Sequence, residues 1–249
     1  MAWHEERLVG FDLETTGTDP STARIVTAAV VETKGGEVVA GRLWLADPGT
    51  PIPAEATAIH GITTERAADC GRPAREVAEE VATALAGHWS MGVPVIAYNA
   101  AFDLSLLSAE LERYGLRSLT ERLGTERLGT ERLGGDGAGA PAVAGPVVDP
   151  LTIDRAVDRF RKGRRTLAAA CREYGVVLDG AHEAGADALA AVRVARAIAG
   201  RYAHIAAADL WELHRDQTRW YGEWAADYQK WLRRQGNPEA VVEGTWPLR

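Results

Sequence analysis

Three β-rich segments fill the first 45 residues of the chain, and their order limits the folds that it can adopt. Strands are expected at Leu8–Leu13, Ile25–Thr33 and Glu37–Leu45, with a hairpin turn at Gly35-Gly36. Helical periodicity and short apolar strands then alternate. Helices are expected at Pro73–Gly87, Asn99–Tyr114, Pro150–Phe160, Leu167–Tyr174 and Ala184–Tyr202, and further strands at Val93–Tyr98 and Val147–Val148. This order predicts an α/β fold in which helices flank a mixed five-stranded sheet.

The composition of the chain argues against several classes of protein. The chain has no run of 18 apolar residues, and acidic residues follow its start at once, so we expect neither a membrane span nor a signal peptide. Cys70 and Cys171 have no CxxC partner, which argues against a disulfide scaffold and favours a cytoplasmic location. The net charge of −7 argues against a purely electrostatic coat for nucleic acid, but it allows an enzyme whose acids gather in one site.

Two segments depart from the α/β pattern. Residues 117–146 contain the pentad Thr-Glu-Arg-Leu-Gly three times and then a Gly/Ala/Pro stretch, which predicts a flexible or partly helical surface insertion. Residues 204–249 hold five of the eight tryptophans, and this segment predicts a helical extension beyond a domain of residues 1–203. Its apolar stripe is expected to be Leu210, Leu213, Trp220, Trp224, Tyr228 and Trp231. The stripe could pack on the domain, bind a partner protein or a second copy in a homodimer, or stack single-stranded bases.

The sharpest chemical signal is Phe11-Asp12-Leu13-Glu14-Thr15-Thr16-Gly17. Residues two apart in a strand point to the same face, so Asp12 and Glu14 should project together. Two neighbouring carboxylates repel each other, and a hard divalent cation such as Mg²⁺ or Mn²⁺ removes that repulsion. Two acids at the end of a strand can also simply face water.

Two further motifs supply acids and a histidine. Asn99-Ala100-Ala101-Phe102-Asp103 places Asp103 in a helix first turn, where the helix dipole alone would favour a carboxylate. In His182-Glu183-Ala184-Gly185-Ala186-Asp187, the histidine precedes an acid that opens a helix. A histidine there can serve as a general base near neutral pH, or it can be an ordinary loop residue. Taken together, Asp12, Glu14, Asp103 and Asp187 with His182 suit a two-cation site that hydrolyses a phosphodiester.

In order and spacing, these motifs resemble the DEDDh 3′-5′ exonucleases, a family that includes the proofreading subunit of bacterial replicative polymerases and RNase T. Ile59-His60-Gly61-Ile62-Thr63 is similar to a loop of that family, and Asp149 matches an acid often found there. The resemblance covers about residues 6–199 and implies an RNase H-like fold. It also implies cleavage of single-stranded DNA or RNA from the 3′ end, with two Mg²⁺ or Mn²⁺ ions per site and release of 5′-mononucleotides.

The resemblance further implies roles for single residues. Asp12, Glu14 and Asp187 would bind the ions directly, Asp103 would hold one through water, and His182 would be the general base. The expected substrate contacts are Thr15, Thr16, Gly17, His60, Ile62, Asn99 and Phe102. DNA is the favoured substrate. The alternatives are an RNA-specific exoribonuclease and a polymerase-associated module that binds nucleic acid through the C-terminal segment.

The most basic run lies between the second and third motifs. It consists of Arg155, Arg159, Arg161, Lys162, Arg164 and Arg165. These residues could form a basic rim that holds substrate phosphates, or they could be a solvated helix face.

Overall fold

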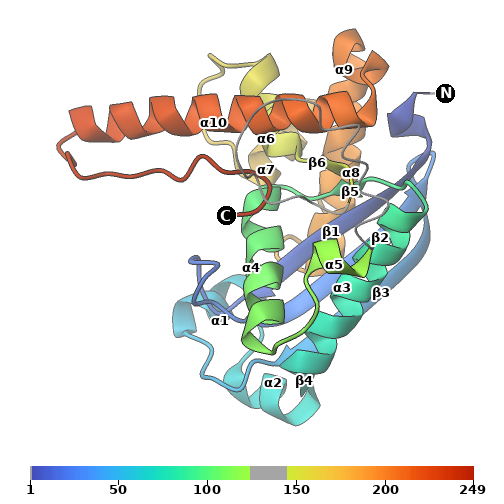
Figure 1. Ribbon diagram of the computed structural model, residues 1–249, viewed down its shortest axis with the longest axis vertical. Helices are drawn as coiled ribbons and strands as arrows, with labels where there is room; N and C mark the ends of the chain where they lie inside the picture. The colour runs from blue at the N-terminus through green and yellow to red at the C-terminus, as the bar shows by residue number, and fades with distance from the viewer. Residues whose placement is uncertain (1, 124–144) are drawn as a thin grey trace.

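The computed structural model describes residues 2–123 and 145–249, and its centre is a mixed sheet (Figure 1). Its strands are β1 (Arg7–Thr15), β2 (Ile25–Lys34), β3 (Glu37–Asp47), β4 (Arg72–Pro73), β5 (Val95–Ile96) and β6 (Val147–Val148). The strand order is β4-β3-β2-β1-β5-β6. Strands β1, β2 and β3 form an antiparallel meander, while β5 and β6 run parallel to β1 and to each other.

The predicted mixed sheet is confirmed, but the predicted count of five strands is wrong. The additional strand, β4, is only two residues long and pairs in parallel with Ala46 and Asp47 at the end of β3. Both of its residues are exposed, so the segment carries no apolar alternation from which a strand could be predicted. The expected strand Val93–Tyr98 is shorter in the structure, where only Val95 and Ile96 form β5.

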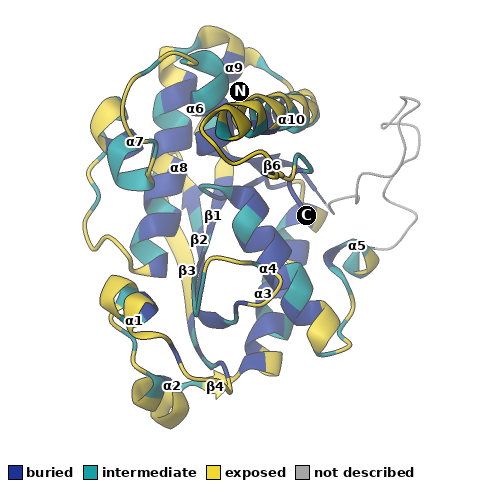
Figure 2. Ribbon diagram, turned by 90° about the vertical axis from the view of Figure 1, so that its left-hand side faces the viewer, coloured by how far each residue is buried: buried dark blue, intermediate teal, exposed yellow. Residues whose placement is uncertain are grey.

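Helices cover both faces of the sheet. Helices α3 (Ala74–Ser90) and α4 (Ala100–Arg113) lie on one side, and α7 (Leu167–Tyr174) and α8 (Ala184–Arg201) lie on the other (Figure 2). The remaining helices are α1 (Ala54–His60), α2 (Thr64–Cys70), α5 (Leu119–Arg122), α6 (Pro150–Val157), α9 (Ala203–Ala207) and α10 (Leu210–Arg234), with a 3₁₀ turn at Trp3–Glu5. No helix within residues 2–123 and 145–249 is both long and apolar enough to cross a membrane.

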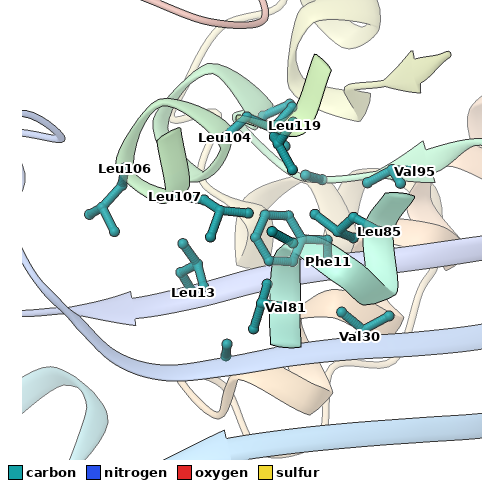
Figure 3. Close-up of a cluster of buried hydrophobic side chains, with 14 of the residues drawn as sticks. Phe11, Leu13, Val30, Val81, Leu85, Val95, Leu104, Leu106, Leu107 and Leu119 are labelled. Carbon is teal, nitrogen blue, oxygen red and sulfur yellow. The ribbon is translucent and has the colours of Figure 1, made fainter. Parts of the chain in front are cut away.

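The main core lies between β1, α3 and α4. Phe11 and Leu13 point from β1 into a cluster with Leu107 of α4 and Val81 of α3 (Figure 3). A second core on the other face joins Leu8 of β1 to the apolar side of α8. Strand β1 therefore packs on both faces, and its alternate residues belong to different layers.

The C-terminal helix α10 is present as predicted. The first part of the predicted stripe packs on the cores, where Leu213 is buried and Leu210, Trp220 and Trp224 are partly buried. The buried residues are Leu213, His214, Gln217, Tyr221 and Ala225. Tyr228 and Trp231 are exposed instead. After α10 the chain runs back along the helix, and Trp246 and Leu248 join Tyr221 in the main core. The extension thus shares its core with residues 1–203.

Two polar side chains of α10 bind the outer edge of β6. The Val147 N–H donates to Nδ1 of His214 at 3.2 Å, and the Asp149 N–H donates to Oε1 of Gln217 at 2.6 Å. Nε2 of Gln217 donates in turn to the Val147 carbonyl at 3.0 Å. Burial lowers the pKa of His214 to about 4, so its imidazole is neutral at pH 7 and Nδ1 can accept.

Most of the repeat insertion, residues 124–144, lies outside the described residues, and with it most of the prediction made for it. The described start of the segment is ordered. Ser118 and Glu121 form a capping box at the start of α5, and Leu119 is buried in the main core. Arg122 forms an ion pair with Glu79 of α3 at 2.6 Å. The predicted helical character therefore applies to this first part.

Candidate active site

Strand β1 directs its two acids toward α8. Residues Val9, Phe11 and Leu13 face the main core, so Asp12 and Glu14 point to the opposite side. The same side carries Gly10, where an added Cβ would lie 2.4 Å from the carbonyl oxygen of Ala188. Only glycine allows this approach, which brings the first turn of α8 against the strand.

The third acid and the histidine come from the start of α8. Asp187 is buried in its first turn, and its Oδ2 accepts the His182 N–H at 3.2 Å. His182 adopts a left-handed backbone with φ of 67° and is exposed. One ligand atom from each of Glu14, His182 and Asp187 lies within 4.8 Å of the others. The three side chains therefore form one cluster that is open to solvent at the histidine.

Helix α4 supplies the fourth acid from the other face of the sheet. Its N-cap, Asn99, takes a left-handed backbone with φ of 69°, and Asp103 follows in the first turn. Asp103 is buried, and its Oδ1 accepts the Leu13 N–H at 3.0 Å. This hydrogen bond is to the residue between the two acids of β1, so it fixes α4 against the site.

The four carboxylates destabilise one another's charged forms. Burial, reinforced by the charges of Asp103, Asp187 and Glu14, raises the pKa of Asp12 well above its ordinary value. Burial and the charge of Asp187 raise the pKa of Glu14 from 4.5 to about 7. Burial is also the largest cause of the raised pKa of Asp103 and of Asp187.

These carboxylates fit a divalent cation. Hard cations prefer carboxylate oxygens, and positive charge would remove the repulsion that raises the pKa values. Oδ1 of Asp187 is buried and has no hydrogen-bond partner among the described residues, which leaves it available as a ligand. Asp12, Glu14 and Asp187 could hold an ion directly. Asp103 has one oxygen engaged with the backbone of Leu13.

The turn after β1 is held by its own side chains. Thr15 Oγ1 donates to the carbonyl of Gly17 at 2.7 Å. The Thr16 N–H donates to the Arg24 carbonyl at 3.0 Å, and Thr16 Oγ1 accepts the Arg24 N–H at 2.9 Å. The three predicted substrate contacts of this turn therefore share one compact loop that directly follows Glu14.

The predicted contacts His60 and Ile62 lie in the loop after α1. Nδ1 of His60 accepts the Ile62 N–H at 3.1 Å. Burial lowers the pKa of His60, and the charge of His182 lowers it further. The Ile62 side chain packs mainly on a small cluster with Ile52 and Ala56. The structure thus brings His60 to the site, while Ile62 is largely a packing residue.

Phe102 and Asn99 flank Asp103 in different ways. Phe102 is half-buried and packs against the main core, which leaves part of its ring accessible. The Asn99 N–H donates to Oδ1 of Asp149 at 3.0 Å. Asp149 is the buried N-cap of α6 and also accepts the hydroxyl of Thr152 at 2.8 Å. Asp149 therefore positions the start of α4 and uses its oxygens for protein hydrogen bonds.

Two supporting residues could not be assigned from the motifs. A glycine inside an apolar strand indicates close backbone approach, so Gly10 carried a signal that motif analysis passes over. Gln217 supports Asp149 from α10, 68 residues later in the chain, and no local pattern predicts that contact. The basic run of residues 155–165 does not act as one unit. Two of its members, Arg161 and Arg165, form ion pairs with the buried Asp154 at 2.5 Å. These two arginines are structural.

Comparison with known proteins places the chain among exonucleases. The chain matches the model of the exonuclease family RNase_T over residues 9–195. It is 39% identical over 108 residues to a DNA polymerase III subunit epsilon-like protein of Rhodobacter capsulatus, a match that covers 40% of this chain and 14% of that protein. It is 27% identical over 210 residues to DNA polymerase III PolC-type of Streptococcus thermophilus, covering 84% of this chain and 12% of that protein.

A solved structure shows the same fold. Exonuclease I of E. coli in complex with single-stranded DNA superposes with a TM-score of 0.63 at 18% identity, over 80% of this chain and 42% of that one. The chain therefore spans less than half the length of each of these relatives. The fold expected from the sequence, an RNase H-like sheet flanked by helices, is confirmed.

Proposed function

The chain belongs to the exonuclease family whose model it matches, and on that premise we propose that it is a metal-dependent 3′-5′ exonuclease acting on single-stranded nucleic acid, DNA in preference to RNA. The observation that carries the proposal is that Glu14, His182 and Asp187 offer ligand atoms within 4.8 Å of one another. Asp12 and Asp103 are close enough to this cluster for the charges of the acids to raise their pKa values, which a cation would reverse. The exonuclease I relative is described in complex with single-stranded DNA, which supports the substrate class.

Mg²⁺ or Mn²⁺, two ions in the proposed site, would lower the pKa of the attacking water and stabilise charge on the leaving oxygen. The ions would bind to Asp12, Glu14 and Asp187, with Asp103 held by its hydrogen bond to the Leu13 N–H at the inner side. Because Asp12 and Glu14 lie on a strand packed on both faces, they need little reorganisation when charge develops.

His182 is the proposed general base. It lies on the solvent side of the carboxylates, where water enters, and its backbone is fixed by the hydrogen bond to Asp187. The imidazole takes the proton of the attacking water as the water's oxygen bonds to the phosphorus. The 3′ oxygen of the preceding nucleotide leaves and takes up a proton from solvent, which releases a 5′-mononucleotide. This assignment gives the exposed histidine a role beyond that of a loop residue.

The substrate end would lie between the turn after β1 and helix α4. Thr15, Thr16 and Gly17 would present their backbone to the terminal nucleotide beside Glu14, and the accessible part of Phe102 would contact its base or sugar. His60 lies near His182, so it would approach the same nucleotide from the α1 loop.

Digestion of matched DNA and RNA strands that carry a 5′ label tests the proposal. We expect a descending ladder in Mg²⁺ or Mn²⁺, faster on DNA, and no products in EDTA. Asp12→Asn should abolish the ladder, while Asp69→Asn, which changes an exposed acid on α2, should retain it. A ladder that persists in EDTA would refute the metal requirement. Immediate release of the labelled nucleotide would refute the 3′-5′ polarity, and faster RNA digestion would favour an exoribonuclease.

A further inference from the structure

A cavity of about 890 Å³ lies between α6, the loop that follows it and α10. Arg155, Arg159 and Arg165 line one wall, and Trp220, Trp224 and Tyr228 of α10 line the other. Beyond this cavity, α10 continues past the rest of the domain (Figure 1). Arg219, Glu223 and Asp227 of α10 line the cavity as well. The α6 side of the groove is therefore basic, and the α10 side is aromatic with charges of both signs.

The segment that forms the basic wall carries more positive than negative charge. Residues 150–166 contain six basic and two acidic side chains, in a chain whose net charge is −7. Arg161 and Arg165 are held by Asp154, and Arg159 pairs with Asp227 across the groove at 2.7 Å. Lys162 and Arg164 are exposed and form no ion pair with any residue that the structure describes. Neither residue lines the cavity, but they flank Gly163, which does. Phosphates at the rim of the groove would meet them there.

The aromatic wall continues along α10 as a row of parallel rings. Trp224 and Tyr228 have ring centroids 5.4 Å apart with an angle of 12° between planes, and Tyr228 and Trp231 are 5.6 Å apart at 11°. Tyr228 is 39% exposed and Trp231 is 46% exposed. The Arg155 guanidinium lies 3.7 Å from the centre of the Trp224 ring and fixes it. Accessible parallel aromatic rings beside cations are the combination that binds single-stranded bases by stacking.

Helix α6 connects this groove to the candidate active site. Its N-cap, Asp149, accepts the Asn99 N–H at the start of α4, and Arg155 lies six residues further along α6, about 9 Å along its axis. A strand whose 3′ end lies beside Asp103 would therefore need only a short path to reach the cavity.

We propose that the groove between α6 and α10 holds the bases and phosphates of the substrate strand 5′ of the nucleotides in the active site. This inference rests on the proposed exonuclease function. Bases stack on the exposed rings of Tyr228 and Trp231, which Trp224 supports, and phosphates meet Lys162 and Arg164 at the rim. A second copy of the chain is a poorer occupant, because a symmetric contact through this face would bring two basic walls together.

The proposal is tested with the double variant Tyr228→Ala/Trp231→Ala, which removes exposed rings only. We expect the ratio of KM on a long oligothymidylate to KM on a trinucleotide to rise about tenfold or more, the effect of losing one stacked base. Met91→Ala removes a side chain that is 64% exposed after α3, and it should leave this ratio unchanged. An unchanged ratio in the double variant would overturn the proposal.

Equilibrium binding separates this inference from the proposed catalysis. Fluorescence anisotropy of the labelled long strand, measured in EDTA with Asp12→Asn, needs no turnover. The double variant should raise Kd about tenfold or more, and Lys162→Ala/Arg164→Ala should reduce the dependence of log Kd on log salt by about one per lost phosphate contact. A wild-type chain that binds but never cleaves would refute the exonuclease and keep the groove. Concentration-dependent dimers that Tyr228→Ala/Trp231→Ala abolishes, with unchanged strand binding, would assign the surface to a second copy and overturn the proposal.

Discussion

Neutralising Glu14 should stabilise the metal-free protein even as it destroys the metal site. In the folded chain, burial and the charge of Asp187 raise the pKa of Glu14 from 4.5 to about 7. Between these two pH values the folded state binds more protons than the unfolded state. Glu14 therefore contributes stability below about pH 4.5, and this contribution is lost as the pH rises through 7. Glu14→Gln stays neutral at every pH and avoids that loss.

The size of the gain follows from the pKa change. A displacement from 4.5 to about 7 corresponds to at most about 3 kcal/mol in the free energy of unfolding. Glu14 is only half-buried, so solvent screens part of this energy, and we expect roughly 1–2 kcal/mol. For a chain of this length, that gain raises Tm by about 2–8 °C.

Thermal unfolding in EDTA, followed by circular dichroism from pH 4 to pH 8, measures the effect. The Tm of Glu14→Gln should equal that of the wild type near pH 4 and exceed it increasingly up to about pH 7. Asp12→Asn, at a partly buried acid with a strongly raised pKa, should show the same trend. Glu239→Gln, which changes an exposed acid after α10, is the matched control and should not move Tm.

Mg²⁺ should reverse the order of stability. It should raise the Tm of the wild type and have little effect on Glu14→Gln, because the variant lacks a ligand. A Glu14→Gln protein whose Tm in EDTA at pH 8 is equal to or below that of the wild type would refute the reasoning. So would a gain of the same size at pH 4 and at pH 8.

Three further outcomes follow from the same structure. His182→Ala should lower kcat by about 10²–10⁴ without changing Tm, and single-turnover digestion at wild-type rate would exclude it as the base. Gly10→Ala should lower the free energy of urea unfolding by about 1–3 kcal/mol, because the added Cβ would lie 2.4 Å from the carbonyl oxygen of Ala188 in α8. The control Gly200→Ala changes a glycine of α8 that has open space around it, so it should not destabilise the protein. Gln217→Ala removes the hydrogen-bond partner of the Asp149 N–H and of the Val147 carbonyl, and each unpaired buried group should lower the free energy of unfolding by about 1–3 kcal/mol. A Tm equal to that of the wild type would contradict the burial of these two backbone groups.

The shared orientation of the two acidic residues of β1 could be predicted from the two-residue alternation of a strand. Strand residues alternate between faces, so Asp12 and Glu14 had to share the face opposite Phe11. That they face the start of α8 depends on Gly10, because only the folded pair of elements shows how close the helix comes. The meeting with Asp103 depends on a hydrogen bond to Leu13 across 90 residues, which no local pattern encodes.

Short helices without a clear hydrophobic periodicity were not predicted from the sequence. Helices α1 and α2 have seven residues each and lie in a stretch that begins with three prolines, so the sequence favours a loop there. On α10 the tryptophans suggested the buried face, yet the core accepts Ala225 and Tyr221. Hydrophobicity alone cannot choose between faces when large aromatic side chains occur on both.

Side chains of α10, rather than another strand, occupy the outer edge of β6. An open sheet edge is a template on which a foreign strand, or a neighbouring molecule, can add itself. Here His214 and Gln217 already use the Val147 N–H, the Val147 carbonyl and the Asp149 N–H, so no strand can add there without first displacing the helix. The helix thus protects this margin of the sheet against intermolecular β-pairing and aggregation.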